Sequence, residues 1–180
     1  ATSFYDAIGG IEVTASHKPI NYNGLKLVRE NSRPISADTG LGDIKELAQS
    51  GKFNPATKGT VTLNTDKTAY IDKLMSFVDT TKFTPKKIVI NSGNGSAGPV
   101  VDELETRLGA NIELIKIHHQ PDGSFPNGIP NPMIIANQKS TSDAVVAHKA
   151  DFGVAFDGDF DRCFLFDEAG NFIEGSYIVG

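Results

Sequence analysis

The sequence predicts an α/β fold: an αβα sandwich with a mixed, mostly parallel sheet, preceded by a partial N-terminal α/β domain. From residue 87 to residue 156, short apolar runs alternate with helical patterns, which is typical of a parallel sheet covered on both faces. The next apolar run, Cys163–Phe166, follows Phe152–Phe156 so closely that these two strands must run antiparallel. A polar stretch at Lys52–Asp66, which holds Pro55 and Gly59, separates the sandwich from the N-terminal domain.

The N-terminal part is expected to contain two short strands and one helix. Gly9–Thr14 alternates apolar and polar residues, and Leu25–Val28 follows as a second strand after the turn-rich segment Ala15–Gly24. A helix should begin near Asp38–Thr39 and end before Gly51, which suits the position after a helix C-terminus.

The sandwich is expected to follow a regular order of elements. A first helix, capped by Thr65 or Asp66, runs to Val78, because its apolar residues recur at helical spacing. The later elements are a strand at Lys87–Asn91, a helix at Pro99–Leu108, a strand at Ile112–Ile117, a proline-rich loop at Pro121–Pro132, a short helix at Asp143–Lys149, and strands at Phe152–Phe156 and Cys163–Asp167.

Composition excludes several classes of function. The chain has 180 residues and a net charge of −5, so it lacks the basic surface of a nucleic-acid-binding protein. It has one cysteine, Cys163, which rules out an internal disulfide and fits a reducing compartment such as the cytoplasm. No apolar run approaches a membrane span and the N-terminus does not resemble a signal peptide, so we expect no membrane partner.

Three aspartates are the strongest functional signal in the sequence. Asp157, Asp159 and Asp161 follow an apolar strand directly and are closed by Arg162. Three carboxylates in five residues repel one another, and packing them between apolar strands would be costly unless a cation neutralises them. Carboxylate oxygens suit Mg²⁺, Mn²⁺ or Ca²⁺ rather than zinc. Ligands of such sheets also bind beyond the carboxyl ends of the strands, where these residues are expected.

Two other interpretations of this cluster fit less well. An EF-hand loop requires a glycine where Arg162 stands, and the second half of the segment is a strand. An aspartyl phosphatase would need a small hydroxyl or β-branched residue at the place that Asp161 occupies. A divalent-metal site in which Arg162 holds phosphate oxygens accounts for all four charged residues.

A serine in a polar loop is a second candidate. Ser16 follows a strand within Thr14–Pro19, and most serines in such loops are turn residues. As a nucleophile or phosphate carrier it would need a strong electrophile, and a phosphoryl group beside Mg²⁺ would be one.

A glycine-rich segment, Gly93–Gly98, matches G-x-G-x-x-G between a strand and a helix. A dinucleotide site would need an acidic residue at the end of the next strand, but that strand ends at Ile117 and is followed by His118 and His119. We therefore favour a glycine-rich turn and expect no dinucleotide cofactor. The two histidines could be metal ligands, although an isolated pair at a strand end is more often structural.

These residues together resemble the α-D-phosphohexomutase family, and within it the bacterial branch that acts on mannose phosphates. The family's serine loop reads T-A-S-H-N-P, then Y-N-G-x-K, as in Thr14–Pro19, Tyr22–Gly24 and Lys26; its metal loop reads D-G-D-G-D-R, as in Asp157–Arg162. Lys18 replaces the usual asparagine and Phe160 the usual glycine. The resemblance covers essentially the whole chain but only part of a four-domain member.

The resemblance implies a domain assignment. Residues 1–60 would be the C-terminal part of the first domain with the serine loop, residues 61–174 the second domain with the metal loop, and residues 175–180 the start of a connection to a third domain. The loops that recognise the sugar and its distal phosphate would lie outside this chain. An unpaired strand edge at Gly9–Thr14 leads us to expect contact with the second domain or self-association.

The resemblance also implies a reaction. Ser16, carried as phosphoserine, would pass its phosphoryl group to a hexose phosphate and form a bisphosphate, which interconverts mannose 6-phosphate and mannose 1-phosphate. Mg²⁺ would be held by Asp157, Asp159, Asp161 and an oxygen of the phosphorylated Ser16. Arg162 would hold phosphate oxygens, and His17 and Lys26 are candidates for proton transfer. The alternatives are a glucose phosphate substrate, or a non-catalytic module that binds a divalent metal.

Overall fold

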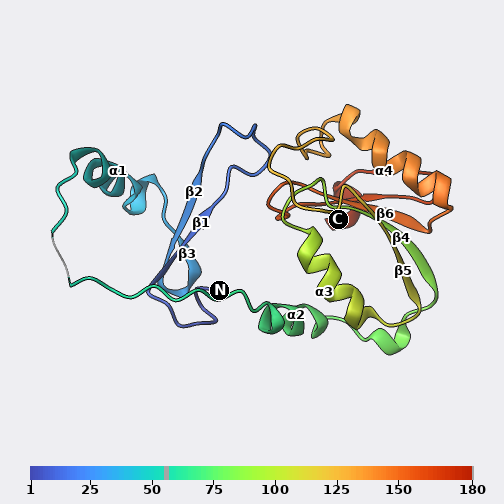
Figure 1. Ribbon diagram of the computed structural model, residues 1–180, viewed down its shortest axis with the longest axis horizontal. Helices are drawn as coiled ribbons and strands as arrows, with labels where there is room; N and C mark the ends of the chain where they lie inside the picture. Colours follow the sequence, from blue (N-terminus) through green and yellow to red (C-terminus); the bar gives the residue numbers. More distant parts are fainter. Residues whose placement is uncertain (55–56, 180) are drawn as a thin grey trace. The chain divides into compact units, whose positions relative to one another are not determined.

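The computed structural model describes residues 1–54 and 57–179, which divide into two units (Figure 1). The first unit comprises Ala1–Thr14 and Asn23–Thr65, and the second comprises Ala15–Tyr22 and Asp66–Gly180. The loop that carries Ser16 therefore packs with the second unit, although the chain on both sides of it belongs to the first. Pro55, in the predicted linker, and Gly180, at the end of the predicted connection, lie outside the described residues.

The first unit contains an antiparallel sheet and a helix. The strands β1 (Gly9–Val13), β2 (Leu25–Arg29) and β3 (Arg33–Pro34) pair in this order, and α1 (Leu41–Ser50) follows. The two predicted strands are confirmed within a residue. The predicted start of the helix was too early, because Ala37–Thr39 form a separate 3₁₀ turn that Ser36 caps. As predicted, α1 ends before Gly51, which adopts the left-handed conformation with φ 63°.

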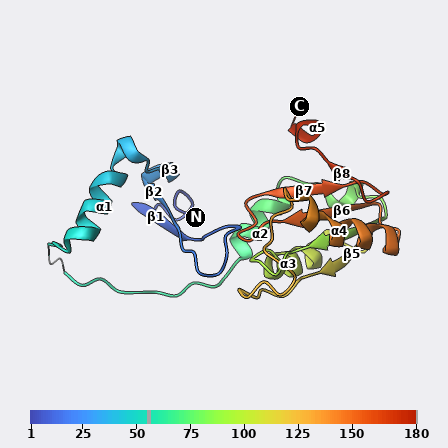
Figure 2. The same ribbon diagram turned by 90° about the horizontal axis from the view of Figure 1, so that it is seen from above.

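The second unit is the predicted mixed sheet between helices. Its order is β5-β4-β6-β7-β8, with β4 parallel to β5 and β6, and the remaining neighbours antiparallel. The strand bounds are Lys86–Asn91 for β4, Ile112–Ile117 for β5, Phe152–Phe156 for β6, Cys163–Phe166 for β7 and Phe172–Ile173 for β8. Helices α3 (Gly98–Leu108) and α4 (Ile135–His148) lie on opposite faces of this sheet (Figures 1 and 2).

Alternation along the strands builds one apolar layer on each face of the sheet. Val89, Ala155 and Phe166 pack with Val145 of α4, whereas Ile90 and Val154 pack with Val101 of α3. Helix α2 (Thr68–Met75) packs against α3 and buries Ile71. This arrangement is the αβα sandwich that the sequence predicted, and it presents the carboxyl ends of β4, β5 and β6 at one edge.

The structure corrects several predicted bounds. Helix α4 begins at Ile135 rather than near Asp143. Its first two turns carry polar residues and show no apolar stripe, so the sequence pattern did not indicate a helix there. Helix α2 ends at Met75 rather than at Val78. The short elements β3, β8 and α5 (Ser176–Val179) were missed, since two to four residues are too few for a periodic pattern. Among the described residues, no helix is long and apolar enough to cross a membrane.

Candidate active site

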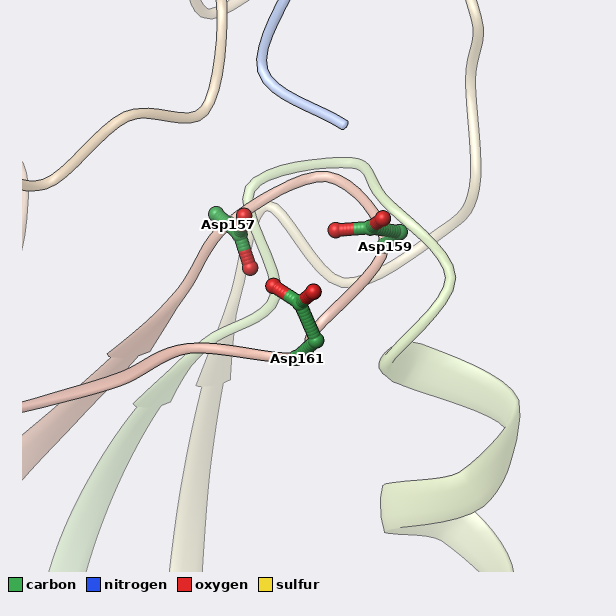
Figure 3. Close-up of side chains that lie close together, drawn as sticks. All are labelled: Asp157, Asp159 and Asp161. Atoms are coloured by element: carbon green, nitrogen blue, oxygen red, sulfur yellow. The ribbon is translucent and has the colours of Figure 1, made fainter. Parts of the chain in front are cut away.

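The aspartate loop leaves the carboxyl end of β6 and turns back into β7. Asp157 is completely buried, Asp159 is half-buried and Asp161 is exposed, yet each offers an oxygen within 4.8 Å of the others. Their carboxylates converge on a common space (Figure 3). The donors are all carboxylate oxygens, so this acidic group could hold a metal ion, and hard cations suit it best.

Phe160 occupies a backbone position that favours glycine. Its backbone is in the left-handed region with φ 47°, and its N–H donates to the carbonyl oxygen of Asp157 at 3.1 Å. Glycine adopts that conformation without steric cost, whereas a side chain strains it. The Phe160 ring packs edge-on against Phe156 with centroids 6.4 Å apart, and this contact offsets part of the strain.

Ser16 meets the aspartate loop although 141 positions separate it from Asp157. Its hydroxyl oxygen lies 3.0 Å from Asp157 Oδ2 and 3.0 Å from Asp159 Oδ1. A hydroxyl has one proton, so it donates to one carboxylate at a time. The Ser16 backbone is also in the left-handed region, with φ 55°, and strain of this kind in a non-glycine residue is concentrated at functional sites.

Arg162 compensates the charge of the buried Asp157. Its Nε donates to Asp157 Oδ2 at 2.9 Å, Nη2 donates to the same oxygen, and its backbone N–H donates to Oδ1 at 3.2 Å. Without such partners, a fully buried carboxylate would be strongly disfavoured. The guanidinium therefore holds the base of the aspartate loop in place.

The same guanidinium reaches the serine loop. Arg162 Nη2 lies 3.0 Å from Ser16 Oγ and also within hydrogen-bonding distance of His17 Nδ1, so its two protons are shared among these atoms and Asp157 Oδ2. Because a guanidinium can only donate, Nδ1 is the acceptor, and the neutral His17 ring carries its proton on Nε2. His17 Nδ1 also lies 3.3 Å from Ser16 Oγ. One charged side chain thus joins the serine loop to the aspartate loop.

Six of the seven predicted site residues meet in this cluster of the second unit: Ser16, His17, Asp157, Asp159, Asp161 and Arg162. Lys26 lies on β2 of the first unit. The catalytic and metal-binding roles of all seven residues stay predictions.

Comparison with known families identifies the family to which this fold belongs. The model of phosphoglucomutase/phosphomannomutase α/β/α domain II matches residues 68–170, and the model of domain I matches residues 1–55. The chain belongs to the phosphoglucomutase/phosphomannomutase family. The resemblance noted in the sequence is therefore confirmed.

The relatives agree in sequence and in structure. Curated phosphomannomutases from Salmonella montevideo and Escherichia coli are each 57% identical over 100% of this chain, which spans 41% of either relative. A phosphoglucomutase/phosphomannomutase family protein from Burkholderia thailandensis, solved by crystallography, superimposes with a TM-score of 0.81 at 30% identity. That match covers 94% of this chain and 35% of the other. The chain thus spans about two fifths of the curated relatives.

The backbone of the glycine-rich turn, Gly93–Gly98, contacts the backbone of the aspartate loop, which the sequence analysis did not predict. A Cβ on Gly95 would lie 2.5 Å from the carbonyl oxygen of Gly158, and the Ser96 N–H donates to that oxygen at 3.0 Å. A Cβ on Gly158 would in turn lie 2.2 Å from the carbonyl oxygen of Ser16. The glycines are needed where three protein backbones approach one another, as the turn interpretation predicted. Glycines in both the glycine-rich turn and the aspartate loop were the feature of the sequence that could have indicated this close approach.

The two histidines after β5 have different surroundings. His119 Nε2 lies 2.9 Å from Asp102 Oδ1, and Nδ1 lies 3.3 Å from the buried Ser92 hydroxyl at the start of the glycine-rich turn. Within residues 1–54 and 57–179, neither histidine belongs to a group of three metal-ligating side chains. The contacts of His119 thus join β5 to α3 and to the glycine-rich turn, whereas His118 lines a cavity that is described below.

Proposed function

We propose that this chain is the serine- and metal-bearing part of a phosphomannomutase, which interconverts mannose 6-phosphate and mannose 1-phosphate through a phosphoserine and a hexose bisphosphate. The observation that carries the proposal is the approach of Ser16 Oγ to Asp157, Asp159 and Arg162, at 3.0 Å in each case. A hydroxyl beside a carboxylate cluster and a guanidinium is suited to carry a phosphoryl group, because a cation and an arginine can then share its charge.

Magnesium is the proposed ion. Asp157, Asp159, Asp161 and an oxygen of phosphorylated Ser16 would hold it, since hard cations prefer oxygen ligands. Ser16 Oγ lies 3.0 Å from an oxygen of Asp157 and from an oxygen of Asp159, so a phosphoryl group on Ser16 would bring its own oxygens next to these carboxylates. When bound, Mg²⁺ would neutralise negative charge on the phosphoryl group.

The proposed transfer exchanges one phosphorus–oxygen bond for another. The bond from phosphorus to Ser16 Oγ breaks, a bond from phosphorus to a sugar hydroxyl oxygen forms, and the hydroxyl proton passes to a base. The resulting hexose bisphosphate then returns its other phosphoryl group to Ser16 Oγ, which gives the isomeric monophosphate. Ser16 loses one phosphoryl group and gains one in each cycle, so it is phosphorylated again when the cycle ends.

His17, Lys26 and Arg162 complete the proposal. Arg162 would hold phosphate oxygens, and His17 and Lys26 are the candidates for moving the proton. His17 Nδ1 accepts a hydrogen bond from Arg162 Nη2 in the unphosphorylated chain. It becomes available as a base when the guanidinium turns toward a phosphoryl group on Ser16. Phosphorylation of Ser16 would thus free His17 Nδ1 to accept the proton of the sugar hydroxyl.

Phosphorylation of Ser16 is the direct test. The chain is incubated with Mg²⁺ and mannose 1,6-bisphosphate or glucose 1,6-bisphosphate, and the modified residue is located by mass spectrometry. We expect a phosphoryl group on Ser16, none in Ser16→Ala, and an unchanged signal in the control Ser50→Ala, whose serine is the last residue of α1. Phosphorylation that persists in Ser16→Ala would contradict the proposal. Faster transfer from the glucose compound would favour the phosphoglucomutase alternative, and tight Ca²⁺ binding without phosphorylation would favour a non-catalytic module.

Two further parts of the proposal concern location and assembly. We place the protein in the cytoplasm, where hexose phosphates and a reduced Cys163 are expected. We also propose self-association through the first unit, since its strands expose Ile11, Val13 and Leu25 at 65%, 71% and 60%. Sedimentation velocity across a range of concentrations checks this, and a monomer at every concentration would contradict it.

A further inference from the structure

A polar cavity of about 350 Å³ lies beside the aspartate loop, within the second unit. It is bounded by the ends of β4 and β6, the residue after β5, the proline-rich loop and the first turns of α4. Its hydrogen-bonding walls include Asn91, His118, Asn127, Asn137 and Ser140. None of the seven predicted site residues lines it.

The cavity stands where the strand order of the sheet reverses. The chain passes from β4 to β5 on one side, and then returns through α4 to β6 on the other side of β4. Open α/β sheets bind ligands in the crevice beyond the carboxyl ends of the strands at this point. Asn91 ends β4 and Phe156 ends β6, so the two strands on either side of the reversal both contribute to the walls.

The walls are held by their own hydrogen bonds. Asn91 Nδ2 donates to Thr141 Oγ1 at 2.9 Å, and its Oδ1 accepts from the Gly93 N–H at 2.9 Å. Asn137 Nδ2 donates to the carbonyl oxygen of Ile129 at 2.9 Å, and Asn127 Nδ2 donates to Asn94 Oδ1 at 2.8 Å. The β5–α4 loop is therefore fixed on both sides of the cavity before any ligand enters, which favours binding by reducing the ordering that binding requires.

Several polar atoms of the lining stay available. In the described part of the chain, the His118 ring and the side-chain oxygens of Asn127 and Asn137 have no hydrogen-bond partner. His118 also has a left-handed backbone with φ 44°, a strained conformation that is typical of functional positions. A partly buried imidazole without a partner, in such a backbone, indicates a ligand contact.

The cavity carries little net charge. Lys139 Nζ is paired with both carboxylate oxygens of Asp143, at 3.0 Å and 2.7 Å. Burial lowers the pKa of His118 below its usual range, so the ring is neutral near pH 7. Neutral amides, a hydroxyl and a neutral imidazole offer both donors and acceptors, which matches the hydroxyl groups of a polyol. Ile129, Pro130 and Phe156 add apolar surface that can contact the C–H groups of a sugar ring.

We propose that this cavity binds a neutral polyhydroxylated molecule of monosaccharide size. Ligand sites of small molecules begin at about 300 Å³, so one hexose ring with a few waters fits. The proposal goes beyond phosphoryl transfer at Ser16, because it concerns a separate set of residues and requires neither the metal nor the serine. A weak site is expected, with a dissociation constant on the order of 1 mM for a ligand of this size.

The test uses the whole chain labelled with ¹⁵N and titrated with D-mannose, D-glucose or myo-inositol in the presence of EDTA. We expect saturable amide shifts at Gly93, His118 and Asn137 with at least one of these probes. Ala136→Phe should weaken binding by roughly tenfold or more, because the new ring enters the cavity. The matched control is Ala147→Phe, which places the same ring on an exposed part of α4 outside the cavity.

Each alternative outcome overturns the proposal in a different way. Absence of shifts with all three probes removes the site, provided that the spectrum is that of a folded chain. Equal weakening by Ala147→Phe shows that the shifts report a general effect, and displacement of the sugar by inorganic phosphate shows an anion site instead. Ser16→Ala should bind the sugar normally, so a failure of phosphoryl transfer at Ser16 leaves this result unaffected.

Discussion

Replacing Gly158 with alanine should separate the serine loop from the aspartate loop. The added Cβ would lie 2.2 Å from the carbonyl oxygen of Ser16, whereas Cβ contacts below 3.0 Å essentially do not occur in proteins. One of the two backbones must therefore move by about 0.8 Å. Gly158 does not have a positive φ, so alanine is conformationally acceptable there and the perturbation comes from the contact with the Ser16 carbonyl group, since Pro130 lies at an ordinary 3.5 Å.

The displacement is large compared with the tolerance of the site. Ser16 Oγ lies 3.0 Å from Asp157, Asp159 and Arg162, and a direct shift of about 0.8 Å takes these contacts beyond hydrogen-bonding distance. A hydrogen bond to a charged group contributes about 1.5–3 kcal/mol, so docking of the serine loop should weaken by about 2 kcal/mol. Misplacement of a reacting group by about 1 Å costs on the order of 100-fold in rate.

Two measurements check this prediction. The rate of Ser16 phosphorylation from a hexose bisphosphate should fall by about 100-fold, and hydrogen exchange should increase across residues 15–22. The control is Gly175→Ala in the same unit, where an added Cβ meets no atom within 4 Å. An unchanged rate and unchanged exchange in Gly158→Ala would refute the argument that the close approach of these backbones positions Ser16.

Three further predictions concern metal, turn strain and pH. Asp159→Asn should weaken Mg²⁺ binding by at least the roughly 10-fold that loss of a partner of a metal ligand costs, as seen in a calorimetric titration, whereas Asp143→Asn on α4 should leave it unchanged. Phe160→Gly should be about 1 kcal/mol more stable than Phe160→Ala in urea unfolding, because only the glycine escapes the left-handed strain at φ 47°. The hydrogen bond from Lys116, followed by that from His119, lowers the pKa of Asp102. Its stabilisation should therefore be complete above its ordinary pKa and lost as the pH falls through the lowered value, so that wild type and Asp102→Asn converge in acid.

Opposite outcomes would contradict these predictions one by one. Normal Mg²⁺ affinity in Asp159→Asn would remove that carboxylate from the metal site. Equal stability of the glycine and alanine variants would show that the turn relaxes without cost. A constant stability difference between wild type and Asp102→Asn from pH 7 to acid would show that ionised Asp102 contributes nothing to folding.

Most of the fold of the second unit could be predicted because its signals are local. The segment Ile112–Ile117 is rich in β-branched and other apolar residues, and the structure has a strand with the same limits. The start of α4 could not be predicted, since the polar residues Asn137 and Ser140 face a cavity rather than an apolar core and therefore break the stripe. Tertiary contacts there override the periodic pattern on which helix prediction depends.

For the candidate site too, the features that are local in the sequence could be predicted, and the contacts between distant segments could not. Asp157, Asp159 and Asp161 were found as a group because they are close in the chain and follow a strand end, where α/β folds bind ligands. The supporting glycines were seen but assigned no partner, because the approach of Gly95 to Gly158 joins segments more than 60 positions apart. No spacing rule connects residues at that distance.

By itself, the sequence determined the fold class, four of the five strands of the mixed sheet and the position of the aspartate loop, because each depends on residues within a few positions of one another. Only the tertiary structure decided that the loop at Ala15–Tyr22 packs with the second unit and that Arg162 joins Ser16 and His17 to Asp157. It also decided that Asn91, His118 and Asn137 share one cavity. These contacts depend on the path of the chain between distant segments. Strand pairing and core packing determine that path, and local residue patterns do not encode it.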